Sequence, residues 1–182
     1  MKITNLEIPD VLLIEPDVYT DNRGFFVETF QAQKYADLGL PGQFVQDNHT
    51  GSRNGTLRGM HYQICRSQAK LIRVTVGEIF DVAVDLRKNS KFFRYWVGLN
   101  LSSEEHHQLW IPEGFAHGFL VLSEWAEVEY KVTDYYTPEC ERTLLWNDPE
   151  INIDWPLGEN QNPILSEKDF KGTLLANADL FE

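Results

Sequence analysis

Residues 71–86 read LIRVTVGEIFDVAVDL, and this stretch decides the fold class of the chain. Its first six residues are rich in β-branched side chains, which favour strands, and they end at the turn signal Gly77-Glu78. From 79 to 86 the side chains alternate, with Phe80, Val82, Val84 and Leu86 on one face and Asp81, Ala83 and Asp85 on the other. A period of two indicates a strand, so the stretch predicts two strands joined by a tight turn.

Similar short strands are predicted along most of the chain. They cover one or two strands within 3–14, broken by Pro9, and then 25–30, 44–49, 92–101, 108–111, 118–122, 126–136 and 143–146. A helix is predicted over 31–38, and another from about Ser166, where Ser166-Glu167-Lys168-Asp169 resembles an N-cap followed by an acidic first turn. Many short strands separated by Gly, Pro and Asn indicate an all-β antiparallel sandwich or jelly roll with a few short helices, mainly near the C-terminus. With neither repeat nor linker, residues 1–182 are predicted to form a single domain.

Composition narrows the class of partner. The net charge of -12 argues against nucleic acid and membrane surfaces, but a small anion could still bind where Arg23, Arg58, Lys70 and Lys168 gather. The first residues are polar and do not form a signal peptide, and the apolar run 11–14 is too short to span a bilayer. Cys65 and Cys140 belong to no CxxC or Cys/His cluster, so two reduced cysteines in a cytoplasmic protein are expected.

Two polar residues lie on strand faces that should point inward. Tyr130 shares the parity of Ala126 and Val128, and Lys70 shares that of Ile72 and Val74. An inward ammonium is unfavourable unless it is paired or lines a wet cavity. The alternatives are a core tyrosine whose hydroxyl bonds to the backbone and a lysine that extends to solvent from a strand end.

The stretch GTLRGMHYQ, residues 55–63, adds a fixed cation and a base in a chain with only five histidines. Arg58 and His61 have opposite parity, so we expect Gly59 to let the strand bulge and bring both side chains to one cavity. In a second loop, 110–119, Pro112 and Gly114 lead to His117 at the entry of the next strand. Taken by itself, a histidine such as His61 is more often a structural residue than a catalytic one.

Other chemistries find little support in the sequence. His61 and His117 lack a well-placed third ligand, so no metal is predicted. There is no GxSxG, Walker or GxGxxG motif, and neither cysteine has a neighbouring base. The class of chemistry that the sequence still supports is proton transfer in a cavity lined by β-strands.

At this point the chain resembles the dTDP-4-dehydrorhamnose 3,5-epimerases of the cupin superfamily. Colinear motifs carry the resemblance at 21–28, 46–48, 57–63, 77–87, 111–119 and 165–169. It implies a cupin-type jelly roll and an isomerase that needs no cofactor. The implied reaction inverts C3 and C5 of dTDP-4-dehydro-6-deoxy-D-glucose, on the way to dTDP-L-rhamnose. Met60 and Tyr62 depart from the usual leucine and phenylalanine, and the loop 64–69 is unusual.

The resemblance also implies roles. His61 would be the base, Asp169 would accept its other N–H, Tyr130 would return a proton from the opposite face, and Lys70 would stabilise enolate charge. Hydrogens α to the C4 ketone are acidic, so these residue types suit the chemistry. The implied substrate contacts are Arg23, Phe26, Glu28, Gln46, Asn48, Arg58, Lys70, His117, Tyr136, Glu141 and Lys168. The Arg23–Glu28 strand is expected to complete the pocket of a partner in a homodimer.

Several readings stay open at this level. A related enzyme could epimerise one centre only or act as a ketoisomerase on a similar dTDP-4-keto-6-deoxy sugar. A binding protein without catalysis and a metal-dependent cupin are the other classes. The sequence leaves open whether the product enters a cell-wall polysaccharide or a secondary metabolite.

Overall fold

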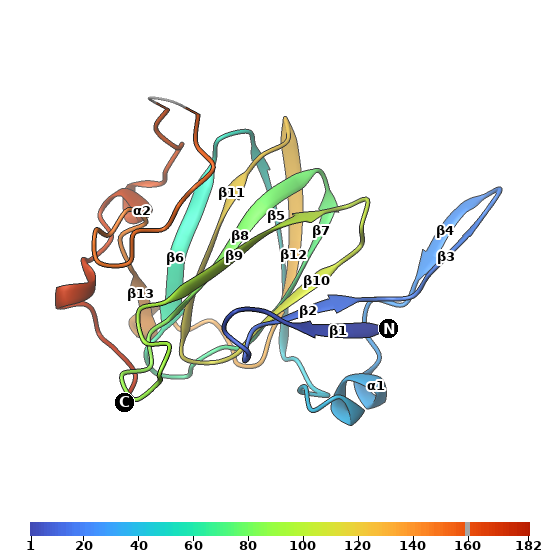
Figure 1. The fold of residues 1–182 in the computed structure, drawn as a ribbon, viewed down its shortest axis with the longest axis horizontal. Coiled ribbons are helices and arrows are strands. Elements are labelled where there is room, and N and C mark those ends of the chain that lie inside the picture. The colour runs from blue at the N-terminus through green and yellow to red at the C-terminus, as the bar shows by residue number, and fades with distance from the viewer. Residues whose placement is uncertain (159–160) are drawn as a thin grey trace.

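The computed structural model describes residues 1–158 and 161–182, and most of its strands form two antiparallel sheets packed face to face (Figure 1). The six-stranded sheet has the order β1-β2-β10-β7-β12-β5, and the five-stranded sheet β13-β6-β11-β8-β9. The strands are β1 Lys2–Asn5, β2 Leu12–Glu15, β3 Val18–Asp21, β4 Gly24–Val27, β5 Gln46–Arg53, β6 Leu57–Gln63, β7 Lys70–Val76, β8 Glu78–Asp85, β9 Trp96–Ser102, β10 Gln108–Ile111, β11 Phe115–Val121, β12 Trp125–Val132 and β13 Glu141–Thr143. The helices are α1 Ala32–Asp37, α2 Glu167–Phe170, η1 Pro138–Cys140 and η2 Leu175–Asn177.

The two strands predicted from residues 71–86 are present, and they belong to different sheets. β7 lies in the six-stranded sheet and β8 in the five-stranded one, so Gly77 is the corner between them. Gly77 has a φ of +77°, and a Cβ there would lie 2.1 Å from the Trp125 carbonyl oxygen. Only glycine combines this backbone with such a close approach.

Apolar side chains from both sheets fill the space between them. Ile72 and Val74 of β7 meet Phe119 and Val121 of β11 in this core. On β8, Ala83 joins this core, whereas Val82 and Val84, together with Leu86 just after the strand, face outward, beneath Trp155 and Leu175 of the C-terminal segment. Both faces of β8 are therefore buried, which alternation alone does not reveal.

Several predicted strands are shorter or shifted in the structure: the one expected at 25–30 ends at Val27, and the one expected at 143–146 is Glu141–Thr143. The stretch expected at 92–101 becomes a strand only at Trp96, and the stretch expected at 126–136 ends at Val132. After Val132 the chain bends, and Asp134 in this bend forms an ion pair with Arg66 of the loop that follows β6. The longest helix, α1, is near the N-terminus and is capped by Gln31.

The hairpin of β3 and β4 extends away from both sheets (Figure 1). It exposes Tyr19, Phe25 and Phe26, each more than 60% accessible. Exposed aromatic side chains gathered on one element indicate an interaction surface. Among the described residues, no helix is long and apolar enough to cross a membrane.

The expectation of two reduced cysteines is wrong for this structure. Cys65 and Cys140 form a disulfide across 75 residues of sequence. β13 pairs with β6 through Glu141 and Gln63, and the Ile64 amide donates to the Cys140 carbonyl, so the two cysteines lie side by side. Strand pairing brings them together, and no local motif in the sequence reports it.

Candidate active site

Polar side chains gather in a pocket of about 330 Å³ between the two sheets. β5, β7 and β12 form one wall, β6, β11 and β13 form the other, and α2 supplies a residue at the edge. The lining residues are Gln46, Asn48, Thr50, Arg58, His61, Tyr62, Gln63, Gln68, Lys70, His117, Phe119, Tyr130, Tyr136, Glu141 and Lys168. Ten residues proposed from the sequence are thus brought together.

His61 is backed by a buried carboxylate from the far end of the chain. Its Nε2 lies 2.5 Å from Oδ1 of Asp169, which is 3% exposed. The Ser166 hydroxyl donates to the second carboxylate oxygen of Asp169 over 2.8 Å and caps α2 by accepting the Asp169 amide. An ionised Asp169 makes Nε2 the protonated nitrogen, so Nδ1 is the nitrogen able to take a proton.

Burial and hydrogen bonding set the charge of this pair. Burial lowers the pKa of His61 below its usual 6.5, against the opposing effect of Asp169, so the imidazole is neutral at pH 7. Burial by itself would raise the pKa of Asp169, but the hydrogen bonds from His61 and Ser166 hold it below its usual value. The result is a neutral base oriented by a fixed anion.

A bulge in β6 turns both Arg58 and His61 toward the pocket. His117 pairs with His61 and Phe119 with Arg58, so two steps along β11 correspond to three steps along β6, which therefore has one extra residue. Gly59 supplies the irregular backbone with a φ of +139°, and a Cβ there would lie 2.5 Å from the Gly118 Cα. The bulge predicted at Gly59 is confirmed. The Arg58 Nε donates to Ser52 over 2.8 Å, which orients the guanidinium.

Lys70 is a buried cation on the opposite wall. It is 8% exposed, and its ammonium donates to the His61 carbonyl over 3.2 Å. Burial lowers the pKa of Lys70 to about 8, although Asp81 and Glu141 favour the charged form. The inward parity predicted for Lys70 is correct, and the side chain does not escape to solvent.

Tyr130 also faces inward, from β12. It packs against the core and lines the pocket, so its inward parity is confirmed. Burial raises the pKa of Tyr130 above its usual 10, with Arg58 opposing. The phenol is therefore neutral at pH 7 and can donate a proton.

His117 has a buried partner that the sequence did not reveal. Its Nε2 lies 2.9 and 3.0 Å from the two carboxylate oxygens of Asp81, which is fully buried. In the sequence Asp81 reads only as the polar member of an alternating strand. On β8 Asp81 lies opposite Phe119 of β11, two residues along from the partner of His117, so its side chain reaches His117 only when the two strands pair.

Tyr136, Glu141 and Lys168 form the pocket mouth. Glu141 accepts from the Lys168 ammonium over 2.8 Å and from the Tyr136 hydroxyl over 3.0 Å. Burial tends to raise the pKa of Glu141, but Lys168 and Tyr136 hold it below its usual value. Gln46 donates to Asn48 over 2.8 Å and accepts from the Tyr136 amide over 3.1 Å. Sequence reasoning missed Thr50, Tyr62, Gln63, Gln68 and Phe119 as lining residues, since each reads as an ordinary strand or loop residue.

A family model described as dTDP-4-dehydrorhamnose 3,5-epimerase matches residues 5–177. The chain belongs to this epimerase family. A dTDP-4-dehydrorhamnose 3,5-epimerase of Pseudomonas aeruginosa is 57% identical over 182 residues, covering 100% of this chain and 99% of that protein.

Solved structures of epimerases share the fold. The dTDP-6-deoxy-D-glucose-3,5-epimerase of Legionella pneumophila, in complex with dTDP-4-keto-L-rhamnose, is 51% identical with a TM-score of 0.94, over 98% of this chain and 94% of that chain. A 3'-monoepimerase of Streptomyces bikiniensis, in complex with dTDP-quinovose, is 31% identical with a TM-score of 0.88, over 96% and 88%. The predicted cupin-type jelly roll is therefore confirmed.

Three proposed contacts lie outside the pocket of this epimerase chain. Arg23 pairs with Asp21 within the hairpin, Phe26 packs near Tyr19, and Glu28 pairs with Lys34 of α1. None of them lines the pocket between the sheets. The hairpin carries Arg23 and Phe26 away from their own site (Figure 1).

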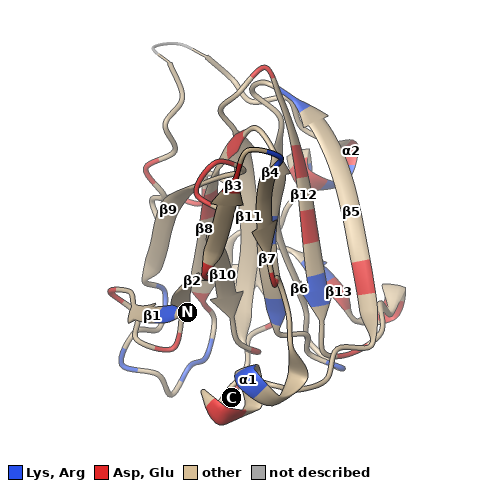
Figure 2. Ribbon diagram, turned by 90° about the vertical axis from the view of Figure 1, so that its right-hand side faces the viewer, with Lys and Arg blue, Asp and Glu red and all other residues tan. Residues whose placement is uncertain are grey.

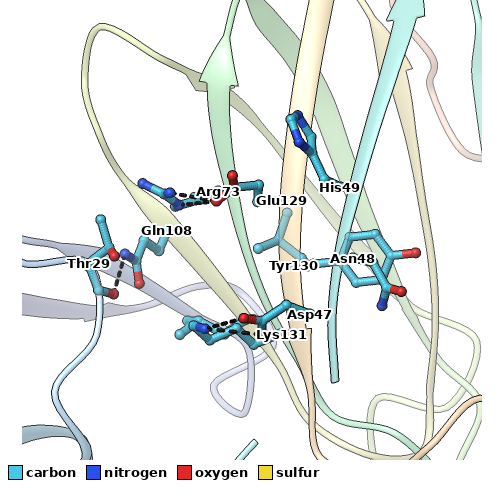
Figure 3. A pocket seen from close by; sticks show the side chains of 11 residues that line it. Thr29, Asp47, Asn48, His49, Arg73, Gln108, Glu129, Tyr130 and Lys131 are labelled. Carbon is cyan, nitrogen blue, oxygen red and sulfur yellow. Dashed lines mark hydrogen bonds and ion pairs between the residues drawn. The ribbon is translucent and has the colours of Figure 1, made fainter. Parts of the chain in front are cut away.

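The outer face of the six-stranded sheet carries a smaller cavity of about 180 Å³ (Figure 3). Its charges are mutually neutralised: Arg73 pairs with Glu129 and Lys131 with Asp47. Gln108 donates to the Thr29 carbonyl and accepts from Tyr35. β12 and β5 present both acidic and basic segments on this side (Figure 2). Because these groups already satisfy one another, the inter-sheet pocket is the better candidate active site.

Within residues 1–158 and 161–182, no three His, Cys, Asp or Glu side chains are grouped so that they could hold a metal ion. The ionisable groups of the inter-sheet pocket instead form two His–Asp pairs and a cation–carboxylate pair. Lys70 and Arg58 are the cations there without a carboxylate salt bridge among the described residues.

Proposed function

We propose that the protein is a dTDP-4-dehydrorhamnose 3,5-epimerase that converts dTDP-4-dehydro-6-deoxy-D-glucose into dTDP-4-dehydro-L-rhamnose. The observation that carries the proposal is His61, backed by buried Asp169, in one pocket with a buried ammonium and a neutral phenol. This set suits proton removal α to a ketone and proton return on the other face. Family membership supports the same reaction.

In the proposed mechanism His61 is the base. Its Nδ1 takes the proton from C3 or C5, and the electron pair of the broken C–H bond becomes the enolate of the C4 ketone. Asp169 accepts the Nε2 proton in a hydrogen bond and stabilises the imidazolium that forms, as the carboxylate does in a hydrolase triad. The neutral imidazole at pH 7 is ready for this step.

Lys70 and Tyr130 complete the proposed proton transfer. The Lys70 ammonium stabilises negative charge on the C4 oxygen, an effect worth several kcal/mol in a water-poor site. Tyr130 lies on the opposite sheet from His61, so its hydroxyl can protonate the carbon from the other face and invert the centre. Repeating the cycle at the second carbon requires no net redox change, and we propose that no cofactor takes part.

The diphosphate is proposed to bind Arg58 and Lys168, because charge-assisted bonds to phosphate are strong. Gln46, Asn48 and His117 supply polar contacts, while Tyr136 and Glu141 act at the pocket mouth. Arg58 has no carboxylate partner among the described residues, so it is open to an anion in spite of the net charge of -12. These assignments concern binding and orientation.

Arg23, Phe26 and Glu28 are proposed to act in a homodimer. They are remote from their own pocket, and the hairpin exposes a set of aromatic side chains that a partner surface could bury. Each hairpin would then complete the pocket of the other chain. We also propose a cytoplasmic location, since an anionic nucleotide sugar does not cross a bilayer unaided and the enzyme must meet it where it is made.

Proton NMR of dTDP-4-keto-6-deoxyglucose with the enzyme in D2O tests the function. Deuterium should enter at both C3 and C5, excess EDTA should leave the rates unchanged, and His61→Ala should abolish exchange at both positions. Exchange at C3 alone would favour a single-centre epimerase, a possibility raised by the 31% identical monoepimerase. Tight dTDP binding without exchange in the wild-type protein would mean a binding protein instead.

A further inference from the structure

The Cys65–Cys140 disulfide lies beside the pocket mouth. Cys140 directly precedes Glu141, and Cys65 lies two residues after Gln63, the strand partner of Glu141. Cys65 is exposed, whereas Cys140 is 5% exposed. The covalent bond therefore joins the loop that follows His61 to the residue that begins β13.

Glu141 depends on this junction for its position. β13 has only three residues and is the edge strand of its sheet, with β6 as its only strand neighbour there. The preceding residues 133–140 contain a single 3-10 turn and no strand. The end of β13 is held by the Thr173 amide, which donates to the Thr143 carbonyl, whereas Glu141 at its start follows an irregular segment and is the end more open to fraying.

The polar contacts around the junction also depend on the loop after β6. Gln63 donates to the Arg66 and Tyr135 carbonyls, and Arg66 pairs with Asp134. Arg66 has a φ of +52°, a conformation that a non-glycine residue keeps only when its surroundings hold it. The disulfide is the only covalent bond between the loop and the residues before β13, so it holds these contacts in register.

We propose that the Cys65–Cys140 disulfide positions Glu141, and through it Tyr136 and Lys168, at the pocket mouth, so that the redox state of this bond tunes binding of the sugar nucleotide. This inference rests on the proposed epimerase function. His61, Asp169 and Lys70 keep hydrogen bonds of their own that do not involve Glu141, so we expect reduction to change the chemical step much less than it changes binding.

The redox step balances with a dithiol as the reductant. A dithiothreitol thiolate attacks the sulfur of exposed Cys65, and Cys140 leaves as a thiolate that takes up a proton. The second reagent thiol then releases Cys65, so that the protein gains two electrons and two protons and the reagent becomes a cyclic disulfide. Air or a disulfide reagent reverses the reaction.

Kinetics of the oxidised and reduced enzyme test the proposal. Reduction should raise KM for the sugar nucleotide and the dissociation constant of dTDP by about threefold to tenfold, the effect of loosening a charge-assisted contact, and leave kcat within about twofold. Thiol titration of the unfolded protein should find no free thiol before reduction and two after it. The proposal would be overturned if the protein had free thiols before reduction that an oxidant could not join into a disulfide. It would also be overturned if KM did not change on reduction.

Variants separate positioning from general stability. Cys65→Ser and the double variant Cys65→Ser/Cys140→Ser should have the KM of reduced enzyme, not respond to dithiothreitol, and melt roughly 5–15 °C lower. Ser123→Ala is the matched control, because it removes a hydroxyl that bonds Glu78 and Trp125 outside the pocket. It should lower the melting temperature with no change in KM. If Ser123→Ala raised KM as much as Cys65→Ser does, the disulfide would act through general stability only. If no form of the protein, the oxidised wild type included, exchanged deuterium into the substrate, the epimerase function itself would be refuted.

Discussion

His61 and Lys70 have opposite requirements for protonation, and burial adjusts both toward neutral pH. His61 must be uncharged to take a proton, and burial holds its pKa below 6.5. Lys70 must be charged to stabilise an enolate, and burial brings its pKa to about 8. The interval between these two values is the range in which the proposed site is correctly charged.

The pH dependence of kcat/KM should therefore be bell-shaped. It should rise as His61 loses its proton below pH 6.5 and fall as Lys70 loses its proton near pH 8. Lys70→Met should lower kcat by roughly 10²- to 10³-fold, since an enolate-stabilising cation is removed, and should eliminate the alkaline fall. Rate measurements from about pH 5 to 10 check this, and a fall near pH 8 that persists in Lys70→Met would assign the alkaline limb to another group.

Ser166 is expected to tune the His61–Asp169 pair. Its hydroxyl donates to the Asp169 oxygen that His61 does not contact, which withdraws charge from the carboxylate. In Ser166→Ala the carboxylate becomes more basic, so the pKa of His61 should rise and the acid limb of the pH profile should move to higher pH. Loss of the α2 cap should also reduce stability by about 1 kcal/mol. Ser166→Thr keeps the hydroxyl and should restore the profile, whereas a profile unmoved in Ser166→Ala would limit Ser166 to capping.

The β6 bulge is the element that makes one site from two strand faces. In a regular strand Arg58 and His61 would point to opposite sides, because their positions differ by an odd number. The extra residue at Gly59 changes the parity, and the close approach to Gly118 leaves no room for a side chain there. An anion anchor and a base thus come to one pocket from the same strand.

If each β3–β4 hairpin completes the pocket of the partner chain, two inactive variants should restore activity to each other. Arg23→Ala damages the hairpin and leaves its own pocket intact, while His61→Ala damages the pocket and leaves the hairpin intact. When the two variants are refolded together in equal amounts and the chains pair at random, half of the dimers should be mixed. Each mixed dimer should have one intact site out of two, so the mixture should have about a quarter of the wild-type activity.

Size-exclusion chromatography with light scattering checks that the variants form dimers. Arg23→Ala mixed with itself and His61→Ala mixed with itself are the controls, and both should stay low. No recovery in a mixture shown to contain mixed dimers would mean that each hairpin serves its own chain.

At the scale of the whole molecule, the buried Lys70 reduces stability in return for its proposed role. Its pKa falls from 10.5 in the unfolded chain to about 8 in the fold, so folding at pH 7 is opposed by about 3 kcal/mol. Between about pH 8 and 10.5 the unfolded chain binds more protons than the folded one. The contribution of Lys70 to the free energy of unfolding should therefore become less unfavourable as pH rises from about 8 to 10.5.

Lys70→Met tests this effect on stability. It should be more stable than the wild type by roughly 2–3 kcal/mol at pH 7, with the difference shrinking toward pH 10.5. Urea unfolding at several pH values gives the comparison, with both proteins kept oxidised. A difference that does not depend on pH would assign the gain to packing of the methionine.

The sequence by itself determined the β class, most strand positions, the inward parity of Lys70 and Tyr130, and the bulge at Gly59. These features depend on local periodicity and backbone sterics, which neighbouring residues in the chain set. The family resemblance added Asp169 and the other contacts, because a residue 108 positions from His61 has no local signature.

Only the tertiary structure decided which distant groups meet. Pairing of β8 with β11 brought the Asp81 carboxylate within hydrogen-bond distance of His117, and pairing of β6 with β13 brought Cys65 next to Cys140. The C-terminal segment covered the outer face of β8 and made both of its faces buried. Such contacts follow from the order of strands in the sheets and from long-range packing, and a period of two along the chain carries no information on either.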